Sequence, residues 1–210
     1  MVYEPCPEPP PARGGHPPAA ELKIVIAGGF GVGKTTLVGA LSEIEPLLTE
    51  ELLTVASEGT DDLEGIRNKT TTTVAMDFGR ITFTSPRPMV LFLFGTPGQQ
   101  RFWFTWNDLS QGAIGAVILA DTRRLEDSFT AVAYFEQRKT PFVVAVNEFD
   151  DAYQYSCDEV RQALELPEDV PVLTCDARDR QSAKDVVIAL VSHSLAAIRS
   201  RPSPSLGAHA

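Results

Sequence analysis

One stretch of nine residues constrains the fold of this chain more than any other. Gly28, Gly33, Lys34 and Thr35 occupy the fixed positions of the pattern G-x-x-x-x-G-K-[ST]. An apolar run over 22–27 directly before it predicts a buried strand, and the periodic residues from Thr36 onward predict a helix. A strand, a glycine-rich loop and a helix in this order predict a phosphate-binding loop.

The chemistry of such a loop comes mainly from its backbone. Glycines allow successive N–H groups to turn toward one centre, and the helix N-terminus adds partial positive charge. The Lys34 side chain is expected to reach the β- and γ-phosphates of a nucleotide, and the Thr35 hydroxyl is expected to bind Mg²⁺. The predicted nucleotide-binding residues of the loop are Gly28, Gly29, Phe30, Gly31, Val32, Gly33, Lys34, Thr35 and Thr36.

Charge and composition narrow the class of protein. The formal net charge of −10 over 210 residues argues against a nucleic-acid surface or a polybasic membrane patch. The longest apolar run, 112–120, is too short to span a bilayer. Neither a signal peptide nor a lipidation motif is expected at the ends, and three widely spaced cysteines favour a reducing compartment. We therefore expect a cytoplasmic protein without a membrane anchor of its own, able to reach the inner face of a membrane through partners.

The remaining pattern predicts one domain between two tails. Residues 1–20 are proline-rich and 199–210 are rich in Ser and Pro, so both are expected to be disordered, with the domain over 21–198. Strands are expected near 73–83 (with a bulge at Gly79), 89–94, 113–120, 141–146 and 170–174. The helix after the glycine-rich loop is expected to end near 45. Further helices are expected at about 125–139, 156–166 and 182–198, with Ser156 and Ser182 as N-caps of the last two. Residues 47–72 are expected to form an irregular connection. This alternation predicts an α/β fold of the P-loop NTPase type, with a mostly parallel central sheet flanked by helices.

The segment after the 89–94 strand resembles switch II of the Ras-like small GTPases. Gly95-Thr96-Pro97-Gly98-Gln99 corresponds to their Asp-x-x-Gly-Gln motif. The resemblance implies that the Gly98 backbone N–H contacts the γ-phosphate and that Gln99, as the catalytic residue, orients the attacking water. Gly95 replaces the aspartate that supports Mg²⁺ in the family. The Thr-Pro-Gly-Gln form is similar to that of the bacterial gliding-motility branch, which also lacks this aspartate.

Switch I and the base-selecting loop show the same resemblance. The segment 73–78 is similar to the Thr-Ile-Gly-x-Asp-Phe pattern of Rab-like proteins, which implies that Thr73 binds Mg²⁺; the threonine run leaves Thr72 as the next choice. Asn147-Glu148-Phe149-Asp150 resembles Asn-Lys-x-Asp. The resemblance implies that the Asp150 carboxylate accepts hydrogen bonds from guanine and that Asn147 braces the loops. Glu148 stands where the family has a lysine. Cys175, Asp176 and Ala177 stand where the family has Ser-Ala-Lys, and one of their N–H groups is expected to donate to the guanine O6.

Two further groups of residues have open roles. The aromatic run 102–106 is expected either to pack beneath switch II or to form a partner surface that changes with the nucleotide. Arg101, Arg123 and Arg124 are candidates for an arginine finger, because a cation on the transferring phosphoryl group offsets its developing charge.

The resemblance to small GTPases covers about residues 21–198 and, more narrowly, is to the GTP-binding proteins of actinobacterial conservon operons. The residues behind it are 94–99, 101–104, 121–124 and 146–150. It implies a slow GTPase that uses GTP/GDP and Mg²⁺ as a switch in a membrane-associated signalling complex, beside a roadblock-type protein and a sensor-kinase-like membrane protein. Gly95 and Glu148 leave open a nucleotide-dependent scaffold without hydrolysis, and an ATPase is a third possibility.

Overall fold

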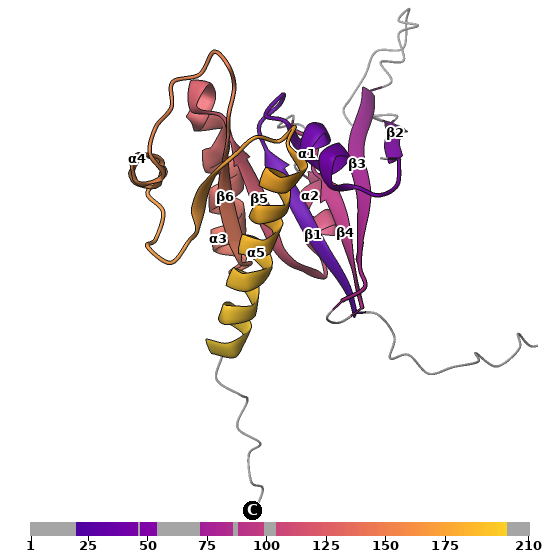
Figure 1. Cartoon of the computed structure of the whole chain (residues 1–210). Helices are drawn as coiled ribbons and strands as arrows, with labels where there is room; N and C mark the ends of the chain where they lie inside the picture. Colours follow the sequence, from indigo (N-terminus) through magenta and orange to yellow (C-terminus); the bar gives the residue numbers. More distant parts are fainter. Residues whose placement is uncertain (1–19, 46, 54–71, 86–87, 99–103, 201–210) are drawn as a thin grey trace, which may run out of the picture.

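A computed structural model describes residues 20–45, 47–53, 72–85, 88–98 and 104–200 (Figure 1). Most of the predicted tails (1–19 and 201–210), most of the predicted irregular connection and the segment 99–103 lie outside these residues. The predicted tail residues 20 and 199–200 belong instead to a strand and a helix. In the described part, no helix is both long and apolar enough to cross a membrane.

Seven strands form one sheet in the order β2-β3-β4-β1-β5-β6-β7. The strands are β1 (Ala20–Gly28), β2 (Leu47–Leu53), β3 (Thr72–Phe83), β4 (Met89–Gly95), β5 (Ala113–Ala120), β6 (Phe142–Asn147) and β7 (Val172–Cys175). Strand β1 pairs in parallel with β4 and β5, and β5, β6 and β7 continue in parallel. Strand β3 alone runs antiparallel to its neighbours, β2 and β4, so the sheet is mostly parallel, as predicted.

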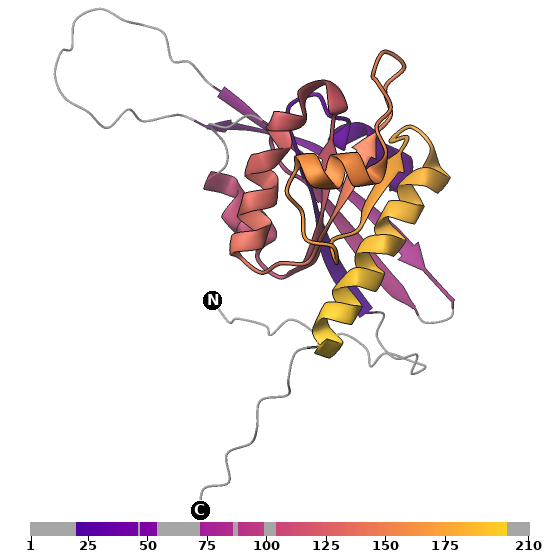
Figure 2. The ribbon, with the colours of Figure 1, turned by 90° about the vertical axis from the view of Figure 1, so that its left-hand side faces the viewer.

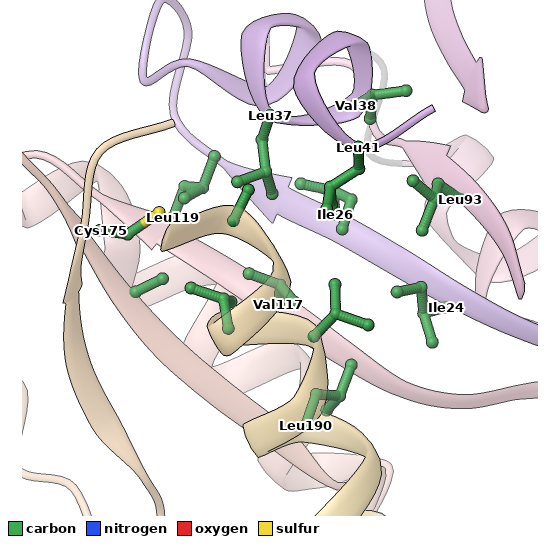
Figure 3. Close-up of a cluster of buried hydrophobic side chains, with 14 of the residues drawn as sticks. Ile24, Ile26, Leu37, Val38, Leu41, Leu93, Val117, Leu119, Cys175 and Leu190 are labelled. Carbon is green, nitrogen blue, oxygen red and sulfur yellow. The ribbon is translucent and has the colours of Figure 1, made fainter. Parts of the chain in front are cut away.

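Helices cover both faces of the sheet (Figure 2). They are α1 (Lys34–Leu41), α2 (Trp106–Ser110), the 3₁₀ segment η2 (Thr122–Ser128), α3 (Phe129–Gln137), α4 (Cys157–Ala163) and α5 (Arg180–Ser200). Successive residues of β1 are fully buried because they point alternately into two cores: Ile24 and Ile26 pack with the α1–α5 side (Figure 3), and Val25 and Ala27 with the α2–α3–α4 side. This explains the continuous apolar run of that strand.

Two expectations about the antiparallel strands are wrong. Leu47–Leu53 is an edge strand paired with β3, not part of an irregular connection. The register of β3 on β4 is continuous from Asp77 to Phe83, so Gly79 forms no bulge there. A Cβ on Gly79 would lie 2.8 Å from Cγ1 of Val38, so the glycine admits helix α1 close to the strand. The phase change in the sequence arises because apolar side chains lie on both faces of β3: Phe78 packs against Phe92 and Phe94 on one face, and Ile81 enters the core on the other.

Helix starts agree only in part with the sequence. Ser156 and Glu159 form the predicted capping box of α4. Helix α5 begins at Arg180, earlier than predicted, and Asp179 caps it by accepting a hydrogen bond from the Ser182 N–H at 2.6 Å. The Ser182 hydroxyl instead accepts from the Asp176 N–H at 3.0 Å. Its predicted capping role is therefore wrong, because the hydroxyl bonds to the loop after β7.

Candidate nucleotide site

The glycine-rich loop joins the end of β1 to the start of α1, at the carboxyl edge of the parallel strands. Ligands of open α/β sheets bind at this edge. Gly28 lies against β5: a Cβ there would come within 2.5 Å of the Leu119 carbonyl oxygen. Gly33 has a positive φ of 104°, and its Cβ would lie 2.7 Å from Nδ2 of Asn147. Both positions therefore require glycine, and they bring the loop close to β5 and to Asn147.

Lys34 is buried inside the loop, with 8% of its surface exposed. Its Nζ donates to the carbonyl oxygens of Gly28 at 3.0 Å and Gly29 at 2.7 Å. Burial lowers the pKa of Lys34 to about 8, although the nearby Asp77 carboxylate opposes this shift. The ammonium group is thus held by the loop's own carbonyls at the position where a phosphate would offer it negative charge.

A cavity of about 290 Å³ opens beside Lys34. Its walls come from the loop, from the start of α1, from β3 and from the segment after β4. The lining residues are Phe30, Gly31, Gly33, Lys34, Thr35, Thr36, Asp77, Thr96, Pro97 and Gly98. A Cβ on Gly98 would lie 2.8 Å from Nζ of Lys34 and equally close to the Phe30 backbone nitrogen, so the predicted switch II glycine touches the loop. Gln99 lies outside the described residues.

The residues around Thr35 fit a divalent cation. Its hydroxyl donates to Oδ2 of Asp77 at 2.8 Å, and Asp77 is 6% exposed. Thr96, in the same cavity, has a buried hydroxyl oxygen without a hydrogen-bond partner among the described residues. Hydroxyl and carboxylate oxygens are the ligands that Mg²⁺ uses beside nucleotide phosphates. Thr73 lies in β3, where its backbone pairs with Leu52.

Asn147 connects the glycine-rich loop to the segment after β7. It is 5% exposed; its Nδ2 donates to the Val32 carbonyl oxygen at 2.9 Å and its Oδ1 accepts from the Ala177 N–H at 3.0 Å. The Glu148 N–H donates to the Cys175 carbonyl oxygen at 2.8 Å. The structure thus brings together the segments that the sequence predicts to bind the phosphates and the base of a nucleotide.

The residues predicted to select the base lie at the end of β6 and after β7. The Asp150 side chain is 87% exposed and lies 3.4 Å from the Arg178 guanidinium, which also forms two hydrogen bonds with Asp176. Arg178 was not predicted from the sequence, although it directly follows the three residues proposed for O6 recognition. Cys175 is buried in the core, and burial raises the pKa of its thiol to about 11, so only its backbone is available to a ligand.

The two described arginine candidates have different surroundings. Arg123 bonds to Asp121 at 2.9 Å and Asp151 at 2.6 Å, and its guanidinium lies 3.8 Å from the centre of the Phe149 ring. It therefore braces the loop that is predicted to select the base. Arg124 instead donates to the Phe30 carbonyl oxygen at 2.9 Å, beside the cavity. Arg101 lies outside the described residues.

The aromatic run after switch II is divided between core and surface. Trp106 is 2% exposed, and its Nε1 donates to the Pro97 carbonyl oxygen at 3.3 Å. Phe104 is 64% exposed. Phe102 and Trp103 lie outside the described residues. One ring therefore packs beneath the segment after β4, as one of the two interpretations predicts, and another remains available to a partner.

Known proteins resemble this chain in fold and in sequence. An uncharacterized protein of Methanocaldococcus jannaschii is 27% identical over 132 residues, which are 62% of this chain and 71% of that protein. The cytosolic domain of the T. maritima FeoB iron transporter, in a GDP form, has a TM-score of 0.60 at 17% identity over 85% of this chain. This chain spans 65% of that structure. The FeoB G-domain of Methanococcus jannaschii has a TM-score of 0.56 at 15% identity, over 84% of this chain and 99% of that one.

These solved structures establish a P-loop GTPase fold, in agreement with the fold predicted from the sequence. Residues 26–197 match the model of a family described as "Conserved hypothetical ATP binding protein". That range contains the glycine-rich loop and the segments predicted to be the two switches and the base-selecting loop. The chain is therefore a nucleotide-binding, G-domain-like protein and belongs to this family of conserved hypothetical ATP binding proteins.

Proposed function

We propose that this protein is a small GTP-binding protein, a slow GTPase that works as a nucleotide-dependent switch in a membrane-associated signalling complex. The observation that carries the proposal is the cavity shared by the glycine-rich loop, Thr35 and Gly98. In a switch of this kind, γ-phosphate contacts order the two switch segments, and hydrolysis releases them. Gly98 touches the loop at Lys34, so a γ-phosphate bound there would meet the segment after β4 directly.

Each predicted site residue has a role in this proposal. Lys34 and the loop amides hold the phosphates, Thr35 and Thr73 bind Mg²⁺, and Gln99 orients the attacking water. Asn147 holds the base-selecting loop against the phosphate loop through its two buried hydrogen bonds. Asp150 and a backbone N–H of the segment Cys175, Asp176 and Ala177 select guanine. Mg²⁺, when bound, offsets the negative charge of the phosphates.

The identity of the base is the first question to test. The family description names ATP, whereas the Asp150 carboxylate can accept two hydrogen bonds from guanine that adenine does not offer. Purified protein with Mg²⁺ is assayed by competition between GTP and ATP. We expect GTP to compete better, and Asp150→Ala to abolish this preference, because the loss of such a pair costs about 1–3 kcal/mol.

Asp151→Ala is the matched control. It removes the neighbouring carboxylate, whose ion pair with Arg123 is at the surface and contributes little, while Arg123 keeps its contacts with Asp121 and the Phe149 ring. This variant should keep the preference for GTP. Equal competition by ATP and GTP in the unaltered protein would contradict the guanine assignment, and a preference for ATP would make the protein an ATPase candidate.

Turnover separates the switch from a scaffold that binds nucleotide without hydrolysing it. Gly95, in place of the switch II aspartate, and Glu148, in place of the lysine, favour the scaffold. Release of phosphate from GTP is measured alone and with a roadblock-type protein, the partner that the resemblance implies beside a sensor-kinase-like membrane protein. Gln99→Leu should slow hydrolysis and leave nucleotide binding unchanged. An unaltered rate would remove Gln99 from the mechanism.

A further inference from the structure

A buried carboxylate occupies the space next to the position where the switch II aspartate is missing. Gly95, at the end of β4, pairs directly with Asp77 of β3 in the antiparallel ladder. A Cβ added to Gly95 would lie 2.8 Å from Oδ2 of Asp77 and 2.9 Å from its Cβ. The pair of residues Asp77 and Gly95 therefore has room for one carboxylate, and in this chain β3 supplies it.

The surroundings of Asp77 suit a cation. The Asp77 side chain lines the same cavity as Lys34 and Thr35. The described residues give its carboxylate one hydrogen bond, from Thr35, and no ion pair within 4.0 Å. Buried charges are normally paired with an opposite charge or bound to a metal. The nearby Lys34 ammonium offsets part of the negative charge of Asp77, but no cation among the described residues is paired with the carboxylate directly, so a positively charged ligand in the cavity has a place beside it.

The distance between the two oxygens also matches a magnesium site. Oδ2 of Asp77 and Oγ1 of Thr35 are 2.8 Å apart. Adjacent oxygen ligands of Mg²⁺, each 2.0–2.1 Å from the ion in an octahedron, lie about 2.9 Å apart. The hydroxyl and the carboxylate can therefore take neighbouring positions around one ion with little movement of either side chain.

We propose that Asp77 is the carboxylate of the magnesium site and replaces, from the neighbouring strand, the aspartate absent at Gly95. This inference rests on the proposed nucleotide-binding function. Among the described residues, no three His, Cys, Asp or Glu side chains gather where they could hold a metal ion. Because Thr35, Asp77 and the proposed ligand Thr73 supply too few of the six ligands of Mg²⁺, nucleotide phosphates and waters complete the site, and Mg²⁺ binds together with the nucleotide.

The test measures how Mg²⁺ slows the release of bound nucleotide. Unaltered protein and Asp77→Asn are loaded with a fluorescent GDP, and the dissociation rate is followed against free Mg²⁺ and in excess EDTA. Asparagine keeps the size of the side chain and an oxygen that can accept from Thr35, but it removes the charge. We expect Asp77→Asn to need roughly 10–100-fold more Mg²⁺ for half-maximal slowing. The rates in EDTA should agree, since no metal is bound there.

Glu43→Gln is the matched control. Glu43 bonds to Arg80 and Thr82 on the same strand, β3, but lies outside the cavity. Its removal should leave the Mg²⁺ requirement unchanged. The proposal would be overturned if Asp77→Asn needed no more Mg²⁺ than unaltered protein and Glu43→Gln. It would also be overturned if Asp77→Asn accelerated nucleotide release equally in Mg²⁺ and in EDTA, because that result indicates a structural role alone.

Moving the carboxylate from position 77 to position 95 of the paired strand gives an independent test. Gly95→Asp alone should weaken Mg²⁺ dependence, because two side chains cannot share the space. Gly95→Asp combined with Asp77→Gly should need less Mg²⁺ than Asp77→Gly alone. Failure of the combined variant to improve on Asp77→Gly would count against the proposal. Protein that binds no guanine nucleotide, with or without Mg²⁺, would overturn the proposed function as well, whereas the other adverse results concern Asp77 only.

Discussion

Replacing Asn147 by alanine tests the connection between the phosphate loop and the base-selecting loop. The side chain satisfies two buried backbone groups, the Val32 carbonyl and the Ala177 N–H. Each buried group left without a partner costs about 1–3 kcal/mol, so Asn147→Ala should lower the free energy of unfolding by about 2–6 kcal/mol. A domain of this size is stable by only about 5–15 kcal/mol, and the loss is therefore a large part of the total.

The assay is urea unfolding of nucleotide-free protein, followed by circular dichroism. Asn107→Ala is the matched control: its Oδ1 accepts from Arg138 at an exposed position, and its loss should change stability by less than about 0.5 kcal/mol. Asn147→Asp should also destabilise, because it retains the acceptor for Ala177 but places a carboxylate oxygen against the Val32 carbonyl. A loss below about 1 kcal/mol for Asn147→Ala would refute the reasoning, since at least one of the two buried groups would then have another partner.

Two further predictions concern the glycine-rich loop. Phosphates bind the protonated ammonium of Lys34, whose pKa burial lowers to about 8. The nucleotide association constant should therefore be flat below about pH 8 and fall up to tenfold per pH unit above it, measured by fluorescence titration; a flat profile across about pH 7–9 would contradict this. Gly33→Ala should lower the free energy of unfolding in urea by about 1–3 kcal/mol through backbone strain, and by a further amount through the close contact of the new Cβ with Asn147. Gly112→Ala is the control for strain alone, because Gly112 also has a positive φ but nothing lies within 4 Å of the new Cβ. Equal losses of stability in the two variants would show that the contact with Asn147 adds nothing.

The local parts of the site could be predicted from the sequence. The glycine-rich loop is recognisable because one strand, one turn and one helix N-terminus form a phosphate site within nine consecutive residues. The apolar run of β1 predicted a buried strand, and its residues are buried because they enter the two cores alternately. Edge strand β2 was missed because its sequence, Leu-Leu-Thr-Glu-Glu-Leu-Leu, lacks a strict alternation of polar and apolar residues.

What only the tertiary structure decided are the contacts between residues far apart in the chain. Thr35 and Asp77 are 42 positions apart, and Gly95 reaches Asp77 only through the register of two antiparallel strands. The sequence shows Gly95 as the loss of a carboxylate, whereas the structure places the Asp77 carboxylate of the neighbouring strand directly beside that position. Arg178 lies against Asp150 because β6 and β7 end side by side. Local patterns report the conformation of neighbouring residues, and a shared cavity depends on strand order and register, which the packing of the whole sheet determines.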